Sequence, residues 1–432
     1  MRSYLEHILG SFYTAAGWNA ENHYANLTAS SRDLLDFDLP SGFILHVSSL
    51  PTGSSASSGT IKNLNGVVDG AISYFYSSPE NILLKSKLRS EDVELTKYLS
   101  GYYQLHLPVT AEDPIYREVW RKGQRVDSKY SLLYGKLYLP SNTLESMFIR
   151  QFSPTDQIVV SAVSDPRIRH GGAIMTQLQH NSGRWCSEMI YSSHEALIGF
   201  RGLYNFAVDS HLPELPLGVS SIPGISGSSA SSLFQLQQSW FSAGGEIYYG
   251  ALNKAAGVSV GLRYATSSSF VNTPTTTTLT LNPVMGQLSV AYAVQATNST
   301  SFASRFDFNA FSYESNLTLG CELWRHKNRD SKVDVFTGLE SNNTAVEKKD
   351  ATKPPSPAQK SSEYSEFATT TSQPPSLIDE SVWKLRVATD SPSVRLLWEG
   401  RMKAFLFSVG AEAGLRADQG VKTFGLELQY AA

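Results

Sequence analysis

The sequence predicts an all-β protein that crosses a membrane as a barrel, on the strength of three observations. Charged residues make up only 17% of the 432 residues, against roughly 25% in a typical soluble domain. Apolar and polar residues alternate along many segments, with the period of a strand that has one apolar face. No stretch reaches the length of about 18 consecutive apolar residues that a spanning helix needs. If the chain lies in a membrane, it must therefore cross it as strands, which close into a ring so that every backbone group is paired.

The N-terminal part, residues 1–36, is expected to be a helical segment. Leu5, Ile8, Leu9 and Phe12 recur at helical spacing, which predicts a short amphipathic helix. Its polar face has almost no Lys or Arg, and this favours packing on the protein's own domain over binding to a membrane surface. The segment lacks the long apolar core and the cleavage site of a secretory signal, so we expect it to be retained.

The remainder, 37–432, is predicted to form the barrel, because alternating segments continue to its end. The apolar positions of the last one are Phe424, Leu426, Leu428 and Tyr430. The opposite face of many segments carries small residues, Arg and Glu, as a water-filled lumen requires. The lumen candidates are Arg263, Arg305, Arg416, Glu412 and Glu427. A water-soluble β-sandwich would show the same alternation, so the pattern alone leaves that alternative open.

Two insertions interrupt the alternation. The first, at about 211–232, is rich in Pro, Gly and Ser and is expected to be a long loop. The second, at about 328–379, is too polar and proline-rich to build a core, which predicts disorder. The segments 316–324 and 382–387 on its two sides alternate alike, so we expect it to divide strands of one sheet.

Motifs of enzymes and of cofactor sites are missing or out of context. The stretch GVSVG, residues 257–261, matches the pattern of a hydrolase nucleophile, but strand alternation runs straight through Ser259 where a sharp turn and a helix are needed. Cys186 and Cys321 lack the spacing of a disulfide framework or a zinc site. A net charge of −3 supplies no basic field for nucleic acid. We therefore expect a protein without enzymatic activity, cofactor, metal or nucleic-acid partner.

Four stretches resemble the fungal family called mitochondrial distribution and morphology protein 10. They are SSRDLLDFDLPSGFILHVSSLPT, GVVDGAISYFYS, RFDFNAFSYESNLTLGCELWR and SVWKLRVATDSPSVRLLWEGRMKAFLFSVGAE. The likeness covers nearly the whole chain apart from the two insertions. It implies a barrel of the mitochondrial porin type with about 19 strands, and a short N-terminal helix in or near the lumen.

The same resemblance implies a location and partners. Members of that family lie in the mitochondrial outer membrane, at contact sites with the endoplasmic reticulum. There they are the membrane-embedded subunit of the ER–mitochondria encounter structure, a tether linked to lipid exchange, mitochondrial morphology and inheritance. They are also part-time subunits of the sorting and assembly machinery, which promotes biogenesis of β-barrel and translocase proteins. The expected partners are subunits of these two complexes and membrane lipids.

The tail TFGLELQY is similar to the sorting signal of mitochondrial outer-membrane barrels. The signal asks for a polar residue, a glycine and two hydrophobic residues, which here are Thr423, Gly425, Leu428 and Tyr430. An odd number of strands makes the first and last strands parallel, unlike the even barrels of bacteria. The segments 43–49 and 423–430 are the expected pair.

Three aromatic residues are candidate partner contacts. Tyr74 and Tyr76 share one parity and place two rings near a strand end, where such rings suit a lipid interface and a protein partner equally. Phe306 and Phe308 are expected to face lipid, whereas Phe311 breaks their parity and is expected to point inward. The alternative function is a porin-like channel for small solutes or ions, for which lumen candidates of both signs predict no ion preference.

Overall fold

The structure is a computed structural model. It describes residues 3–64, 66–78, 90, 95–103, 105, 120–121, 124–125, 130–167, 171–207, 239–266, 273–325, 380–390, 392–415 and 420–432. The insertions expected at 211–232 and 328–379, and the lumen candidate Arg416, lie outside these residues.

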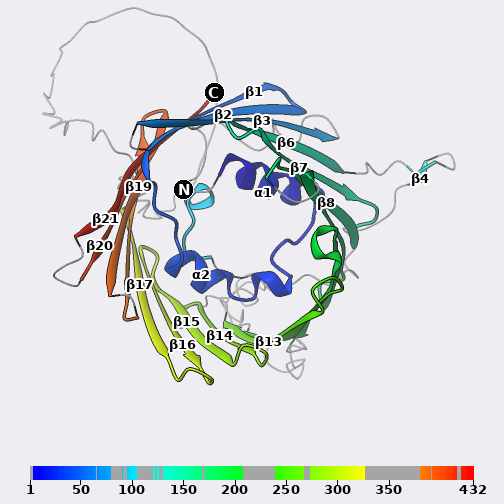
Figure 1. Cartoon of the computed structure of the whole chain (residues 1–432), viewed down its shortest axis with the longest axis vertical. Helices are drawn as coiled ribbons and strands as arrows, with labels where there is room; N and C mark the ends of the chain where they lie inside the picture. Colours follow the sequence, from blue (N-terminus) through cyan, green and yellow to red (C-terminus); the bar gives the residue numbers. More distant parts are fainter. Residues whose placement is uncertain are drawn as a thin grey trace, which may run out of the picture. The chain divides into compact units, whose positions relative to one another are not determined.

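Nineteen strands form one closed sheet (Figure 1). They are β1 (Gly42–Thr52), β2 (Ser55–Leu64), β3 (Val67–Ser78), β6 (Ser131–Leu139), β7 (Thr143–Gln151), β8 (Asp156–Ser164), β9 (Gly172–Asn181), β10 (Trp185–Ser192), β11 (Leu197–Ala207), β12 (Ser239–Gly250), β13 (Ala255–Thr266), β14 (Thr275–Asn282), β15 (Gln287–Thr297), β16 (Thr300–Asn309), β17 (Ser315–Arg325), β18 (Glu380–Ala388), β19 (Ser393–Met402), β20 (Phe405–Gly414) and β21 (Val421–Ala431). A separate pair, β4 (Trp120–Arg121) and β5 (Gln124–Arg125), is antiparallel. The predicted barrel and its number of strands are confirmed.

The ring closes where its first and last strands meet. Within the sheet every pair of consecutive strands is antiparallel, whereas β1 and β21 are parallel, in register from Gly42 opposite Gly425 to Ser48 opposite Ala431. The expected pairing of 43–49 with 423–430 is thereby confirmed. We call this junction the seam.

The two faces of the wall differ as the alternation predicted. In β16, Phe302 and Phe306 are 46% and 44% exposed on the outer face, while Ser301 and Ala303 are buried on the inner face. Strand lengths of 8 to 12 residues match the roughly 9–11 residues that a tilted strand needs to cross a bilayer. The outer face is therefore an apolar belt suited to hydrocarbon. None of the described helices is long and apolar enough to span a membrane.

The N-terminal segment lies inside the ring (Figure 1). It comprises α1 (Tyr4–Ala16), the 3-10 turn η1 (Tyr24–Asn26) and α2 (Ala29–Leu35). A capping box of Ser3 and Glu6 begins α1, and Gly17 in the left-handed conformation ends it. Ile8 and Phe12 are fully buried in a cluster with side chains of β2, β3, β6, β7 and β8. The expected helix in the lumen is confirmed. Two shorter helices are α4 (Leu95–Tyr98) and η4 (His194–Ala196).

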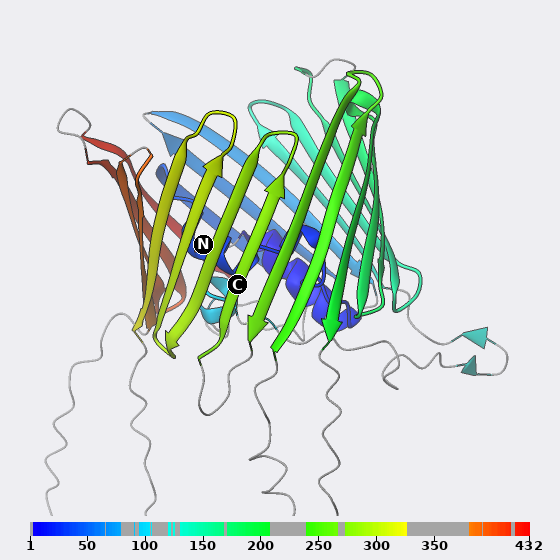
Figure 2. The same ribbon diagram turned by 90° about the horizontal axis from the view of Figure 1, so that it is seen from below.

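The connections between strands differ in length at the two rims. Because neighbouring strands alternate in direction, the connections 79–130, 208–238, 267–274 and 326–379 all start and end on the same rim, where β21 also ends. We call it the long-connection rim, and Figure 2 shows these strand ends at the bottom. The opposite, short-turn rim carries the turns 251–254, 283–286 and 310–314 among others.

Candidate functional site

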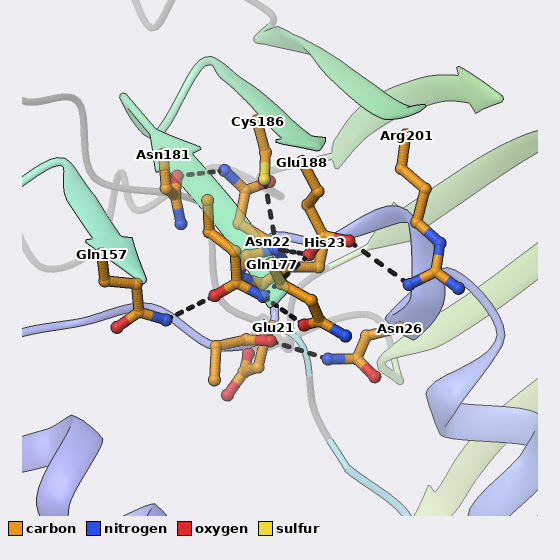
Figure 3. A network of polar contacts seen from close by, with 12 residues as sticks. Glu21, Asn22, His23, Asn26, Gln157, Gln177, Asn181, Cys186, Glu188 and Arg201 are labelled. Atoms are coloured by element: carbon orange, nitrogen blue, oxygen red, sulfur yellow. Dashed lines mark hydrogen bonds and ion pairs between the residues drawn. The ribbon is translucent and has the colours of Figure 1, made fainter. Parts of the chain in front are cut away.

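A buried polar network fixes the chain between α1 and η1 to the inner face of the wall (Figure 3). Asn22 Nδ2 donates to Asn181 Oδ1 at 2.8 Å and to the Gly183 carbonyl at 2.8 Å. Asn205 Nδ2 donates in turn to Asn22 Oδ1 at 2.6 Å. Because a buried amide that loses its partners costs about 1–3 kcal/mol, these bonds hold the segment at one place on the wall.

A row of ionisable side chains continues this network across β10, β11 and β12. His23 Nδ1 lies 2.5 Å from Glu188 Oε1, and Glu188 Oε2 lies 3.4 Å from Arg201 Nη1. Arg201 Nε lies 3.0 Å from Glu246 Oε2. The Cys186 thiol lies 3.2 Å from His23 Nδ1 and is buried. A side chain of the N-terminal segment thus contacts the ion pairs of the wall.

Glycines on the inner face allow the N-terminal segment to approach the wall closely. A Cβ at Gly320 would lie 2.7 Å from Leu35 Cδ2, and a Cβ at Gly261 would overlap Leu27 Cδ2. A larger residue at either position would push the segment away from the sheet. Small residues on this face suggested a water-filled lumen. At these two positions they instead make room for the protein's own N-terminal segment.

A second segment, residues 95–103 and 105, lies against the inner wall and is called the inner segment. Leu95, Tyr98 and Leu99 are buried with Val382 of β18 and Leu406 of β20. At its other end Leu105 packs against Trp240 and Ala265, on β12 and β13. Burial raises the pKa of Tyr98, so its hydroxyl remains neutral and accepts a hydrogen bond from Gln429 Nε2.

The inner segment covers three fully buried charged side chains, Glu322, Lys384 and Glu399, which we call the buried charge cluster. Lys384 Nζ lies 2.7 Å from Glu399 Oε2 and also donates to the carbonyl of Ser100. Glu322 Oε2 accepts the backbone N–H of Tyr102 at 2.9 Å. Two members of the cluster, Glu322 and Lys384, therefore bind backbone groups of the inner segment.

The lumen candidates that the structure describes face inward, as expected, and contact other polar groups. Arg305 Nη2 lies 3.0 Å from Asp36 Oδ1, next to α2, and Arg395 Nε lies 3.0 Å from Glu412 Oε2. Glu427 pairs with His46 at 3.2 Å. Arg263 is buried and donates to Ser242 Oγ at 3.3 Å. The lumen thus presents charges of both signs, several of them engaged with the N-terminal segment or with neighbouring strands.

The four residues that match the sorting signal all lie in β21, next to the seam. Thr423 and Gly425 have the inward parity, and Leu428 and Tyr430 the outward parity. A Cβ at Gly425 would lie 2.5 Å from the carbonyl carbon of Pro40 and 2.8 Å from the Gly42 oxygen. Gly425 thus lies against the point where residues 40–42 lead the chain from the lumen into β1.

Tyr74 and Tyr76 lie on the outer face of β3, close to the long-connection rim, with exposed fractions of 54% and 45%. The cross-strand neighbours of Tyr74 are Ser57 on β2 and Gly135 on β6. Because both neighbours are small, the sides of the Tyr74 ring are uncovered. The two rings project from the wall and offer a contact surface.

Phe311 does not point into the lumen, so that expectation is wrong. The strand β16 ends at Asn309, and Phe311 lies in the following turn, where its N–H donates to Asn309 Oδ1 at 2.9 Å. Its ring is 69% exposed and covers Gly286 of the neighbouring turn. Strand parity no longer applies beyond the end of a strand. Phe311 lies on the short-turn rim, so the structure separates it from Tyr74 and Tyr76.

Sequence reasoning missed the inner segment and its bonds to the buried charge cluster. The signal was present but short, since Leu95, Tyr98 and Leu99 have helical spacing over barely more than one turn. Among the described residues, no group of three or more His, Cys, Asp or Glu side chains is placed to hold a metal ion.

Comparison with known proteins identifies the family. The family model for mitochondrial distribution and morphology protein 10 matches residues 1–432. Proteins of that name from Sclerotinia sclerotiorum and Phaeosphaeria nodorum are 38% and 39% identical, over the full length of both chains. One from Yarrowia lipolytica is 41% identical over 80% of this chain and 90% of its own. This chain therefore belongs to the mitochondrial distribution and morphology protein 10 family.

Proposed function

We propose that this protein is a non-enzymatic subunit of the mitochondrial outer membrane that serves mitochondrial distribution and morphology. In this role it anchors the tether between endoplasmic reticulum and mitochondria at their contact sites. It also associates with the sorting and assembly machinery and so promotes biogenesis of β-barrel and translocase proteins. Its partners are protein subunits of these two complexes, together with membrane lipids.

The observation that carries this proposal is that two segments of the protein's own chain pack on the inner wall of the barrel. The N-terminal segment and the inner segment lie on the inner wall, fixed by buried bonds at Asn22, Glu322 and Lys384. A barrel whose wall is stabilised by such internal segments suits a membrane anchor. The long connections all leave from one rim, which favours a single face for partners outside the bilayer.

The partner surface on the wall is assigned to Tyr74 and Tyr76. Their rings are exposed, and the small neighbours of Tyr74 leave its sides free for another protein. Tyrosine suits such a surface because it combines a large apolar area with a hydroxyl that bonds at the membrane interface. Phe311 is kept as a contact for a different partner, because it lies on the opposite rim.

We expect that replacing Tyr74 and Tyr76 together by alanine lowers co-purification with the sorting and assembly machinery at least tenfold. The two rings supply contact area, and removing aromatic anchors from an interface costs about 2 kcal/mol or more each. The measurement is affinity purification of the tagged chain from solubilised mitochondria, with subunits of the machinery and of the tether quantified separately.

The matched control replaces Tyr204 and Tyr264 by alanine. These tyrosines are similarly exposed on the outer face of β11 and β13, also toward the long-connection rim. The control should retain both complexes, and all variants should keep the mobility shift of a folded barrel on unheated gels. Full recovery of the machinery with the Tyr74/Tyr76 variant would count against this contact surface.

A porin-like channel is tested directly by planar-bilayer recording of the purified full chain. We expect a small conductance without preference between cations and anions, because internal segments occupy the lumen wall and the lumen-facing charges have both signs. A large and ion-selective conductance would instead assign the protein a transport function.

A further inference from the structure

A groove of about 300 Å³ lies on the outer face of the wall, across β15, β16, β17 and β18. Its sides are formed by the large side chains of Tyr292, Phe302, Leu319 and Leu385. Its floor contains the small side chains of Ser304 and Cys321, with the backbone around Gly320. All six named side chains have the outward parity of their strands, so the groove opens away from the lumen.

The groove arises because two outward positions carry small residues between large ones. Ser304 stands between Tyr292 on β15 and Leu319 on β17 in the cross-strand register. Cys321 stands in the same way between Phe302 and Leu385. The depression is thus set by four strands of the sheet and does not depend on a mobile loop.

The surroundings of the groove indicate what fills it. An apolar depression left empty would lose the dispersion contacts of its lining, and on this face of a membrane-spanning strand the adjacent medium is hydrocarbon. A flexible acyl chain can enter a shallow groove of this kind from the bilayer.

Arg325 places a positive charge at the height on the barrel where the phosphate of a lipid in the groove would lie. It is the last residue of β17, exposed on the long-connection rim, with the same outward parity as Leu319 and Cys321. At about 3.3 Å per residue, Arg325 lies roughly 13 Å along the strand from Cys321 and roughly 20 Å from Leu319. Half the hydrocarbon thickness is about 15 Å, so a phosphate at Arg325 places its acyl chain at the groove.

An exposed tryptophan near Arg325 indicates that this height on the wall lies at the membrane interface. Trp383 is exposed on the outer face and lies opposite Leu323, two residues before Arg325. Its ring stacks on Trp398 at a centroid distance of 5.2 Å. Tryptophans concentrate at the level of lipid headgroups, which agrees with a phosphate beside Arg325.

We propose that this groove holds one acyl chain of a phospholipid whose phosphate is bound by Arg325. The site recognises an anionic phosphate above a long apolar chain. The proposal rests on the membrane-spanning fold and is independent of the protein partners proposed above.

The test measures lipid binding to the delipidated full-length protein in a mild detergent by native mass spectrometry. The probes are dioleoyl phosphatidate and dioleoylglycerol, which share their acyl chains and differ in the phosphate. We expect one saturable phosphatidate per barrel, bound at least tenfold more tightly than dioleoylglycerol. Cys321→Trp, which fills the floor, should weaken phosphatidate binding at least tenfold, and Arg325→Gln should abolish the preference for phosphatidate.

Two matched variants serve as controls. Val260→Trp adds the same ring to the outward face of β13, and Arg150→Gln removes an exposed arginine near the same rim on β7. Both should bind phosphatidate like the wild type, and each variant is checked for folding by its mobility on unheated gels. Equal losses in the controls, or no saturable binding to the wild type, would overturn the proposal.

A protein occupant would give a different result. If Cys321→Trp removes a partner's membrane segment from the purified complex while phosphatidate binding is unchanged in every variant, the groove belongs to that partner and the lipid assignment is wrong. The Tyr74/Tyr76 experiment reports on the proposed function separately, because it uses other residues and another readout.

Discussion

Replacing Lys384 by methionine is expected to lower the free energy of unfolding by about 3–5 kcal/mol, the cost of removing one partner from a buried ion pair. Lys384 is 1% exposed, and Glu322 and Glu399 beside it are fully buried. Without the ammonium group, both buried carboxylates lose the positive charge that Lys384 places beside them. The Ser100 carbonyl also loses a donor, so the inner segment should loosen from the wall. Urea titration of the protein in lipid vesicles, followed by tryptophan fluorescence, measures the change.

The double replacement Lys384→Met with Glu399→Leu separates charge from packing. Substituting apolar residues for a buried pair is often close to neutral, so the double variant should regain the part of the loss that comes from Glu399, whereas Glu322 still lacks the ammonium of Lys384. Lys422→Met is the matched control, because Lys422 is exposed on β21 and surface substitutions usually stay within about 0.5 kcal/mol. If the double variant is no more stable than Lys384→Met alone, the loss comes from packing and the electrostatic account fails.

The outer face of the barrel could be predicted from sequence because the bilayer imposes one rule on it. Every second residue of a spanning strand meets hydrocarbon, so Phe306 and Phe424 were assigned correctly from parity alone. The odd number of strands came from the family resemblance, and the pairing of the two end segments followed from it. The structure confirms both the number and the pairing. A closed ring must pair every backbone group, so an odd number of alternating strands leaves the first and last strands only a parallel pairing.

The inner face could not be predicted to the same depth, because two environments select the same residue types. Water in a lumen and a closely packed backbone both favour small residues. The sequence therefore could not show that Gly320 packs against Leu35. The contact joins residues far apart in the chain, which no local period records. The Phe311 error has a related cause, since parity was extended past the end of β16. A turn signal at Asn309, whose side chain accepts the Phe311 N–H, could have marked that end.

Replacing Gly425 by alanine is expected to block closure of the barrel, with a loss of about 3 kcal/mol, the upper end for overpacking. The added methyl would lie 2.5 Å from the Pro40 carbonyl carbon and 2.8 Å from the Gly42 oxygen. Both are backbone atoms, which cannot turn aside as a side chain can. Gly42 has no room to adjust, because it holds a φ of 70° and lies directly against the Asn63 carbonyl. Import into isolated mitochondria followed by carbonate extraction should show little integrated protein.

Folding without any assembly machinery then distinguishes the two roles of this glycine. If Gly425 served only as part of a signal read by that machinery, the alanine variant would refold from urea into lipid vesicles as well as the wild type. The geometry of the seam predicts that it does not. Gly257→Ala should refold normally, because a methyl there meets nothing within 4 Å.

Leu428→Arg should fail in both assays, since a charge on the lipid face costs up to about 2–4 kcal/mol. Thr423→Ala, which adds no bulk, should fail only in mitochondria, and that contrast would assign Thr423 to recognition and Gly425 to closure of the ring.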